Sequence, residues 1–303
     1  MSSTRSTVAG AGTRNPAPAR ADVLDLRVAA PVVELTESTA TLGCPVFAAD
    51  QPPTTPALPC PRCFRPQGRR WVRIVAMKAV LFDWRGTLVV DPPKGWWVER
   101  ALSRLGRNTS TVEIERLVRK LDDAYLHPEV QAGLPTEDCD AQVHREVNLR
   151  WFEIAGLDET LALELYELDF DPECHPFYPD VPQVLDALHS AGLGVAVVSD
   201  IHFDLRPEFA AADLDRYIDV FVLSFEHGFQ KPNARMFQAA LDHLDVAPSA
   251  ALMVGDRSSH DGGAASVGIT TLIFPPLEVF LDRGLRSVLD LCGLGASANP
   301  TST

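Results

Sequence analysis

The sequence lacks a long apolar run and is poor in lysine, while acidic residues are in excess. No hydrophobic run approaches the roughly 20 residues that a membrane-spanning helix requires, so we expect no membrane insertion. The formal net charge of −14 disfavours a nucleic-acid-binding surface, because such surfaces carry clustered basic residues. A secretory signal is also absent, so we expect a cytoplasmic protein whose six cysteines are reduced.

Charge is unevenly distributed along the chain. Residues 1–76 hold nine arginines, no lysine and five acidic residues, whereas the remainder holds 18 basic and 36 acidic residues. The segment contains ten of the 24 prolines and has no sustained helical or strand periodicity, which is typical of disorder. Its first twenty residues faintly resemble an organelle transit peptide. Because Met77 directly precedes a buried-strand pattern, we favour a dispensable extension.

Two cysteines in this extension have the spacing of half a zinc site. Cys60 and Cys63 are separated by two residues, as in many structural zinc sites. The sequence has no second pair of this spacing, residues 1–76 contain no histidine, and Cys44 is the one further cysteine in that segment. The motif by itself therefore favours zinc binding only weakly.

From Met77 onwards, short apolar runs alternate with helical patterns. The runs that indicate buried strands are Lys78–Phe82, Val195–Ser199, Val220–Ser224, Ala251–Val254 and Thr270–Phe274. The segments with helical periodicity are Val181–Ser190, Arg206–Leu214, Ala234–Leu244 and Asp261–Val267. This alternation predicts an α/β fold with a doubly wound parallel sheet. Ligands bind at the carboxyl ends of such strands, where Asp83, Ser199 and Asp256 fall.

The stretch after the first predicted strand interrupts the alternation and is predicted to be helical. Ser110 and Glu113 have the spacing of a capping box. A second helix is predicted to begin near Thr136 and a third after Asp158. The chain is therefore predicted to consist of a disordered extension (1–76), a core (77–91 and 179–292), a helical cap inserted in that core (92–178) and a disordered tail (293–303).

Four short motifs lie at predicted strand ends or helix starts. They are Asp83–Leu88 (DWRGTL), Ser199, Lys231 followed by Pro232, and Gly255–Asp261 (GDRSSHD). They resemble, in order, the D-x-D-G-T-L, Ser/Thr, Lys-Pro and G-D-x-x-x-x-D motifs of the haloacid dehalogenase (HAD)-like hydrolase superfamily. The match spans nearly all of residues 77–275. It implies a Rossmann-like core with an all-helical C1 cap inserted after the first strand, as in subfamily I.

The resemblance implies a magnesium-dependent phosphohydrolase. Asp83 would attack phosphorus and form an aspartyl-phosphate, which splits the hydrolysis into two steps. Asp83, Asp256 and the backbone carbonyl of Arg85 would hold Mg²⁺, with Asp261 supporting them, because Mg²⁺ takes hard oxygen ligands.

Further residues are expected to meet the substrate. By resemblance, Ser199 would donate a hydrogen bond to the phosphoryl group and Lys231 would neutralise charge in the transition state. Asp200 stands where many relatives have Asn, and we place it among the substrate-binding residues as well. The implied substrate is a small phosphorylated metabolite, and we expect a monomer or homodimer.

Arg85 departs from the family pattern, which has an acid/base aspartate at this position. A guanidinium stays charged, so it cannot protonate a leaving group, a function worth about 10²–10⁴ in rate. We keep Arg85 among the catalytic residues of a phosphohydrolase with an unusual leaving-group requirement. One alternative is a catalytically weak binding protein in which Arg85 pairs with Asp83 and Asp256.

Another alternative is hydrolysis of a C–P or C–halogen bond. Haloacid dehalogenases have an aromatic residue at the position of Arg85, and they need no metal. Phosphonoacetaldehyde hydrolases carry D-W-A-G-T, the motif most similar to Asp83–Thr87, and form a Schiff base through a cap lysine. The insert of this chain offers Lys94 and Lys120 for that role.

Overall fold

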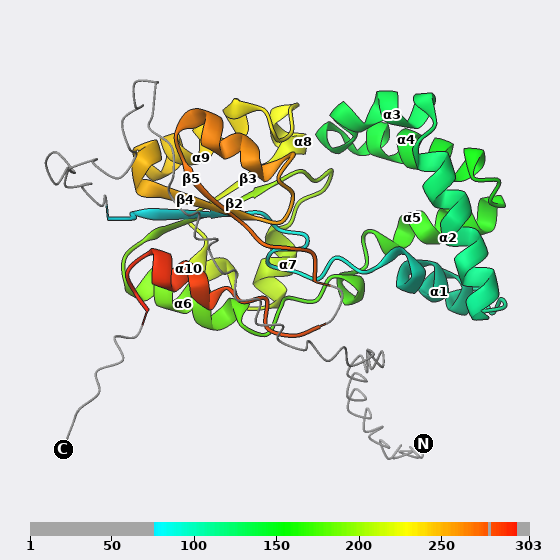
Figure 1. Cartoon of the computed structure of the whole chain (residues 1–303), viewed down its shortest axis with the longest axis horizontal. Coiled ribbons are helices and arrows are strands. Elements are labelled where there is room, and N and C mark those ends of the chain that lie inside the picture. The colour runs from blue at the N-terminus through cyan, green and yellow to red at the C-terminus, as the bar shows by residue number, and fades with distance from the viewer. Residues whose placement is uncertain (1–75, 278–279, 296–303) are drawn as a thin grey trace, which may run out of the picture. The chain divides into compact units, whose positions relative to one another are not determined.

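The computed structural model describes residues 76–277 and 280–295. The predictions for residues 1–75, which include Cys60 and Cys63, and for residues 296–303 therefore lie outside the described residues. The core is a five-stranded parallel sheet with the strand order β3-β2-β1-β4-β5 (Figure 1). The strands are β1 (Ala79–Phe82), β2 (Gly194–Ser199), β3 (Val220–Leu223), β4 (Ala251–Gly255) and β5 (Thr270–Ile273).

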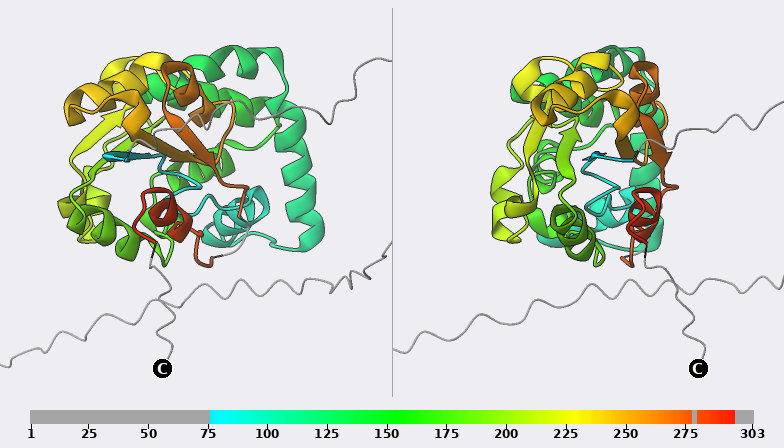
Figure 2. Two further views of the ribbon diagram at one scale, coloured as in Figure 1. Left: turned by 60° about the vertical axis from the view of Figure 1, so that its left-hand side comes forward. Right: turned by 90° about the vertical axis from the view of Figure 1, so that its left-hand side faces the viewer.

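Helices cover both faces of this sheet. Ala79 and Leu81 of the central strand pack against α9 and the 3₁₀ segment η6, whereas Val80 and Phe82 pack against α6, α7 and α10. Successive side chains of a strand point to opposite faces, so a strand covered on both sides is apolar throughout. Figures 1 and 2 show α9 on one side of the sheet and α10 on the other. The covering segments are α6 (Val181–Ser190), α7 (Arg206–Ala211), α9 (Ala234–Leu244), η6 (Asp261–Val267) and α10 (Arg286–Leu291).

The segment between β1 and β2 is a helical cap with an apolar core of its own. Leu121, Phe152 and Leu165 are fully buried at its centre. No helix among the described residues is both long and apolar enough to cross a bilayer. The segments of the cap are α1 (Lys94–Arg104), α2 (Thr111–Tyr125), α3 (Pro128–Gly133), η2 (Leu134–Cys139), α4 (Ala141–Ile154), α5 (Glu159–Leu168) and η3 (Pro172–Cys174).

The predicted fold class is confirmed, and every predicted strand end lies within one residue of the observed one. Three predicted helices differ. The helix predicted over Arg206–Leu214 ends at Ala211, because Asp213 adopts a left-handed conformation (φ 58°). The segment Asp261–Val267 is a 3₁₀ helix, and it contains two consecutive glycines, which favour helices poorly. The helix expected near Thr136 begins at Ala141, after the 3₁₀ segment η2.

The predicted capping box is only half formed. The Ser110 hydroxyl accepts a hydrogen bond from the Glu113 amide at 3.4 Å, as expected for an N-cap. The Glu113 carboxylate, however, binds Arg116 at 2.5 and 2.8 Å instead of returning to Ser110. The Ser110 amide donates to Asn108 at 3.0 Å. Arg116, one turn along the helix, therefore binds the Glu113 carboxylate that a capping box would pair with the Ser110 amide.

Candidate active site

The carboxyl ends of β1, β2 and β4 bring the predicted site residues to one edge of the sheet. Phe82 is in register with Val197 and with Val254 in the two neighbouring strands. Asp83 therefore emerges between Ser199 at the end of β2 and Asp256 just after β4. This is the edge at which parallel sheets bind ligands.

Lys231 is a fully buried cation in this site. Its Nζ donates hydrogen bonds to Asp83 Oδ1 and Asp261 Oδ1, each at 2.6 Å, and its side chain is 0% exposed. Its backbone amide donates to Asp200 Oδ1 at 2.7 Å, which fixes the lysine from the other end. Burial works to lower the pKa of Lys231, yet the charges of Asp83 and Asp261 raise it above its usual range, so the lysine stays charged.

Three carboxylates, those of Asp83, Asp256 and Asp261, converge beside this ammonium. One oxygen of each lies within 4.8 Å of the others. Asp256 Oδ1 is buried and has no hydrogen-bond partner among the described residues. Burial, and then the charge of Asp83, raise the pKa of Asp256 to about 7. An unpartnered buried oxygen among hard oxygen donors is a suitable ligand for a small divalent cation, so the residues present fit the predicted metal site.

Two local features hold the carboxylates in place. The Asp261 Oδ2 atom accepts hydrogen bonds from the backbone amides of Asp256 (3.1 Å) and Arg257 (3.0 Å), which closes the loop after β4. Gly86 has a left-handed conformation (φ 74°), and a Cβ atom at this position would collide with the carboxylate of Asp256. The glycine of the first motif thus allows the β1 loop to approach the acidic cluster.

Arg85 does not point at the acidic cluster but at the cap. Its Nη2 atom forms an ion pair with Asp169 Oδ1 at 2.8 Å, and no ion pair with Asp83 or Asp256 is present. Burial works to raise the pKa of Asp169, yet the charge of Arg85 lowers it to about 2, so this carboxylate is ionised. The hypothesis that Arg85 neutralises Asp83 and Asp256 in place of a cation is therefore wrong for this conformation.

A cavity of about 320 Å³ connects this edge of the sheet with the cap. Asp83, Ser199, Asp200 and Asp256 line it from the core, together with Arg85. Lys231 and Asp261 are not among the lining residues, but Lys231 contacts both Asp83 and Asp261. The structure therefore gathers every predicted site residue in one region, and their individual roles stay predictions.

Several polar residues of the site were not anticipated from the sequence. Arg257 lies within the fourth motif and contacts Asp200 at 3.4 Å. Asp138, His144 and Asp169 line the cavity from the cap, and His202 follows β2. Burial, and then the proximity of His202, lower the pKa of His144 to about 4, so this imidazole is neutral at pH 7. A single polar residue in a helix is a weak indication of a site, because the sequence does not reveal which residues of the cap face the core.

Comparison with known proteins agrees with this geometry. The profile of the haloacid dehalogenase-like hydrolases matches residues 77–268. The phosphoserine phosphatase of Thermus thermophilus is 34% identical over 236 residues, which cover 69% of this chain and 90% of that protein. The (S)-2-haloacid dehalogenase 4A of Burkholderia cepacia is 33% identical over 96 residues, which cover 31% of this chain and 42% of that protein.

Solved structures show the same fold. A crystal structure of a dehalogenase superimposes with a TM-score of 0.53 at 24% identity, over 71% of this chain and 96% of that chain. The family profile covers more than half of the chain, and the matching motifs meet at one edge of the sheet. The protein therefore belongs to the haloacid dehalogenase-like hydrolases.

Proposed function

We propose that this hydrolase is a Mg²⁺-dependent phosphatase that cleaves a small phosphorylated metabolite through an aspartyl-phosphate on Asp83. The observation that carries the proposal is the arrangement of Asp83 between a buried ammonium, Lys231, and a buried, unpartnered oxygen of Asp256. A relative named as a phosphoserine phosphatase supports a phosphorylated substrate. Asp83, Asp256 and the backbone carbonyl of Arg85, with Asp261 in support, would hold Mg²⁺, which would supply positive charge to offset the repulsion between carboxylate and phosphate.

The residues of the chain divide the chemistry between them. The Oδ1 atom of Asp83 is held by Lys231, whereas Oδ2 accepts only a long hydrogen bond of 3.5 Å from Thr87 among the described residues. We assign Oδ2 as the attacking atom: its bond to phosphorus forms while the bond from phosphorus to the leaving oxygen breaks. Lys231 offsets negative charge on the phosphoryl group, and Ser199 donates a hydrogen bond to it. Water then hydrolyses the acyl phosphate and restores the carboxylate.

Arg85 decides which leaving groups are released. Its guanidinium does not release a proton at neutral pH, and it is held by Asp169 at the side of the cavity. Leaving groups that depart without protonation, such as those of aryl phosphates, acyl phosphates and phosphoanhydrides, are therefore the expected substrates. Simple sugar or alcohol phosphates should react slowly, because the general acid is missing.

A panel of phosphorylated compounds, assayed for phosphate release with Mg²⁺ and with a chelator, tests the proposal. Aryl and acyl phosphates should be cleaved only with Mg²⁺, and alkyl phosphates at rates lower by about 10²–10⁴. The Asp83→Asn variant is the control for contaminating phosphatases and should release no phosphate, because an amide is not a competent nucleophile. Equal rates on alkyl and aryl phosphates, or turnover by Asp83→Asn after deamidation is excluded, would contradict the proposal.

Hydrolysis of a carbon–halogen bond is a second candidate, favoured by relatives named as haloacid dehalogenases. It differs from the first in its independence of metal, since Asp83 would then attack carbon. Halide release from 2-haloacids in the presence of a chelator would establish it. The phosphonate alternative is less favoured. Lys94 lines the cavity but is ion-paired with Asp122, and the Lys120 amine contacts the carbonyl of Gly156 at 3.5 Å.

A further inference from the structure

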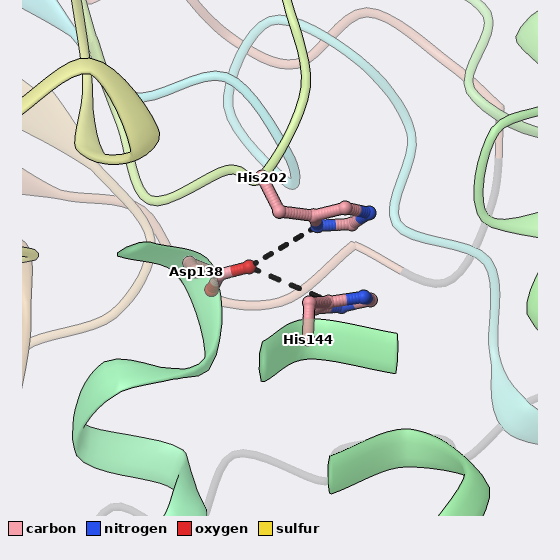
Figure 3. Close-up of side chains that lie close together, drawn as sticks. All are labelled: Asp138, His144 and His202. Atoms are coloured by element: carbon pink, nitrogen blue, oxygen red, sulfur yellow. Dashed lines mark hydrogen bonds and ion pairs between the residues drawn. The ribbon is translucent and has the colours of Figure 1, made fainter. Parts of the chain in front are cut away.

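A second cluster of potential metal ligands lies where the cap meets the core, separate from the carboxylates around Lys231. It consists of Asp138 at the end of η2, His144 in α4 and His202 in the loop after β2 (Figure 3). Asp138 Oδ1 lies 3.5 Å from His202 Nδ1 and 4.0 Å from His144 Nε2. One ligand atom from each residue falls within 4.8 Å of the others.

The two imidazoles of this cluster are buried and stacked. Their ring centroids are 3.3 Å apart at an interplanar angle of 11°, and His202 is 2% exposed. Among the described residues, His202 Nε2 and Asp169 Oδ2 have no hydrogen-bond partner, although they lie 3.8 Å apart. Buried polar atoms without partners are unfavourable, so these two side chains have hydrogen-bonding capacity that the described residues do not satisfy.

We propose that Asp138, His144 and His202 bind a divalent transition-metal ion of the zinc type, which ties the cap to the core. Two imidazole nitrogens and a carboxylate are ligands that zinc accepts, whereas Mg²⁺ prefers oxygen alone. Tetrahedral bonds of about 2.0–2.1 Å place ligand atoms roughly 3.3–3.4 Å apart. The 3.5 Å between Asp138 and His202 is close to this value, whereas the 4.0 Å between Asp138 and His144 must shorten when the ion binds. The stacked rings turn apart to bring the ion into both ring planes, and the terminal torsion of histidine is soft enough to allow this.

The neighbouring residues fit this assignment. If Nδ1 of His202 binds the ion, Nε2 carries the proton and faces Asp169. A metal-bound histidine is typically oriented by a carboxylate in this way. The Nδ2 atom of Asn148 lies 3.1 Å from His144 Nε2 and donates to the His144 carbonyl at 3.0 Å. When the ion binds His144 Nε2, Asn148 loses the first contact and keeps the second.

Charge and backbone contacts point the same way. Asp138 and Asp169 carry two negative charges and Arg85 carries one positive charge, so a divalent cation would bind beside an excess of negative charge. The Ser224 hydroxyl donates to the carbonyl of Asp138 at 2.5 Å and accepts from the amide of Ile201 at 2.8 Å. These bonds hold the segments that carry Asp138 and His202 together before any ion arrives.

The site is a link between two parts of the molecule. Asp138 and His144 belong to the cap, whereas His202 belongs to the core, and the cavity that contains Asp83 lies between them. A bound ion therefore holds the cap closed over the cavity. Its binding requires no hydrolysis by Asp83, so the inference stands or falls independently of the proposed function.

Metal binding to the full chain tests the inference. The protein is stripped with a chelator, supplied with excess Mg²⁺ to fill the oxygen site, and titrated with Co²⁺, whose visible absorption reports its ligands. We expect one equivalent to bind with ligand-field bands and to be displaced by Zn²⁺. His144→Gln and His202→Gln should each weaken binding more than about 100-fold, and Asp169→Asn by about 10–100-fold. The exposed His243→Gln is the matched control and should bind as wild type does.

Further variants locate the ion. Asp83→Asn should leave Co²⁺ binding intact, and so should the double substitution Cys60→Ser, Cys63→Ser. Loss of binding in either variant, thiolate-to-cobalt charge-transfer absorption, or no binding by wild type overturns the inference. Retained binding in His144→Gln and His202→Gln overturns it as well. If circular dichroism shows that one histidine variant is unfolded, Co²⁺ binding by the other histidine variant and by Asp138→Asn decides the question, and retained binding in both overturns the inference.

Discussion

Replacing Lys231 with methionine removes the buried positive charge of the candidate active site. The substitution keeps the length of the side chain but removes the ammonium that contacts Asp83 and Asp261, each at 2.6 Å. Both carboxylates are essentially buried, with side-chain exposures of 4% and 0%. Water therefore cannot replace the lost partner without opening the site.

The size of the effect follows from this burial. Removing one partner of a buried ion pair typically costs about 3–5 kcal/mol, because the remaining charge stays desolvated. For a domain of this size each kcal/mol lowers the melting temperature by roughly 2–4 °C, so we expect a fall of about 6–20 °C. Under the proposed function, Mg²⁺ would supply positive charge to the same carboxylates and should restore part of the loss, about 2.7 kcal/mol at a concentration 100 times its Kd.

Urea unfolding with Mg²⁺ and with a chelator measures both effects. Lys78→Met is the matched control, because Lys78 is exposed and its side chain makes no ion pair among the described residues, and its stability should stay within about 0.5 kcal/mol of wild type. The reasoning is refuted if Lys231→Met loses less than about 1 kcal/mol in the absence of metal. It is also refuted if Mg²⁺ stabilises the variant no more than it stabilises Lys78→Met.

Two further predictions concern the extension and the cap. A chain that begins at Met77 should melt within a few degrees of the full chain, and a larger fall in calorimetry would show that the extension packs on the core. Asp158 caps α5 through the Leu161 amide and binds Arg107 at 2.6 and 2.8 Å, so Asp158→Ala should cost about 1 kcal/mol at pH 7. Hydrogen bonds from Arg107 lower the pKa of Asp158 to about 2, below its unfolded value near 4. The stabilisation is present above pH 4 and disappears as the pH falls towards 2, so urea unfolding should show the deficit of the variant shrinking over that range.

The sequence predicted the core well because its central strands, β1, β2 and β4, are buried on both faces. A strand such as Ala79–Phe82 must be apolar at each position, so its limits are visible as the limits of an apolar run. Helix ends depend on local competition that composition does not reveal. Two examples are Asp213, which is left-handed just after α7 ends, and Arg116, which binds the Glu113 carboxylate in place of the N-cap amide.

The candidate site was predictable only on the side of the core. Asp83, Lys231 and Asp256 sit in motifs whose spacing indicates their convergence, and the structure brings them together. His144 lies in helix α4 of the cap and Asp169 directly follows α5, where polar residues are commonplace. Their meeting with Arg85 depends on how the cap docks, which is a property of the tertiary structure and leaves no local pattern in the sequence.

The ion pair between Arg85 and Asp169 changes how the role of this arginine must be tested. Arg85→Asp alone would supply the general acid that the proposed function lacks, but it places two carboxylates where an ion pair of 2.8 Å stood. A loss of activity would therefore reflect repulsion as much as chemistry. The double variant Arg85→Asp, Asp169→Asn removes that repulsion.

If the missing general acid limits the enzyme, the double variant should hydrolyse alkyl phosphates at least about tenfold faster than wild type, with little change on aryl phosphates. Asp169→Asn alone is the control for the loss of the ion pair, and the three variants form a cycle that separates the two effects. A gain shared equally by aryl and alkyl phosphates would indicate a looser cap. No gain on alkyl phosphates, in a double variant that still cleaves aryl phosphates, would show that Arg85 does not limit the release of the leaving group.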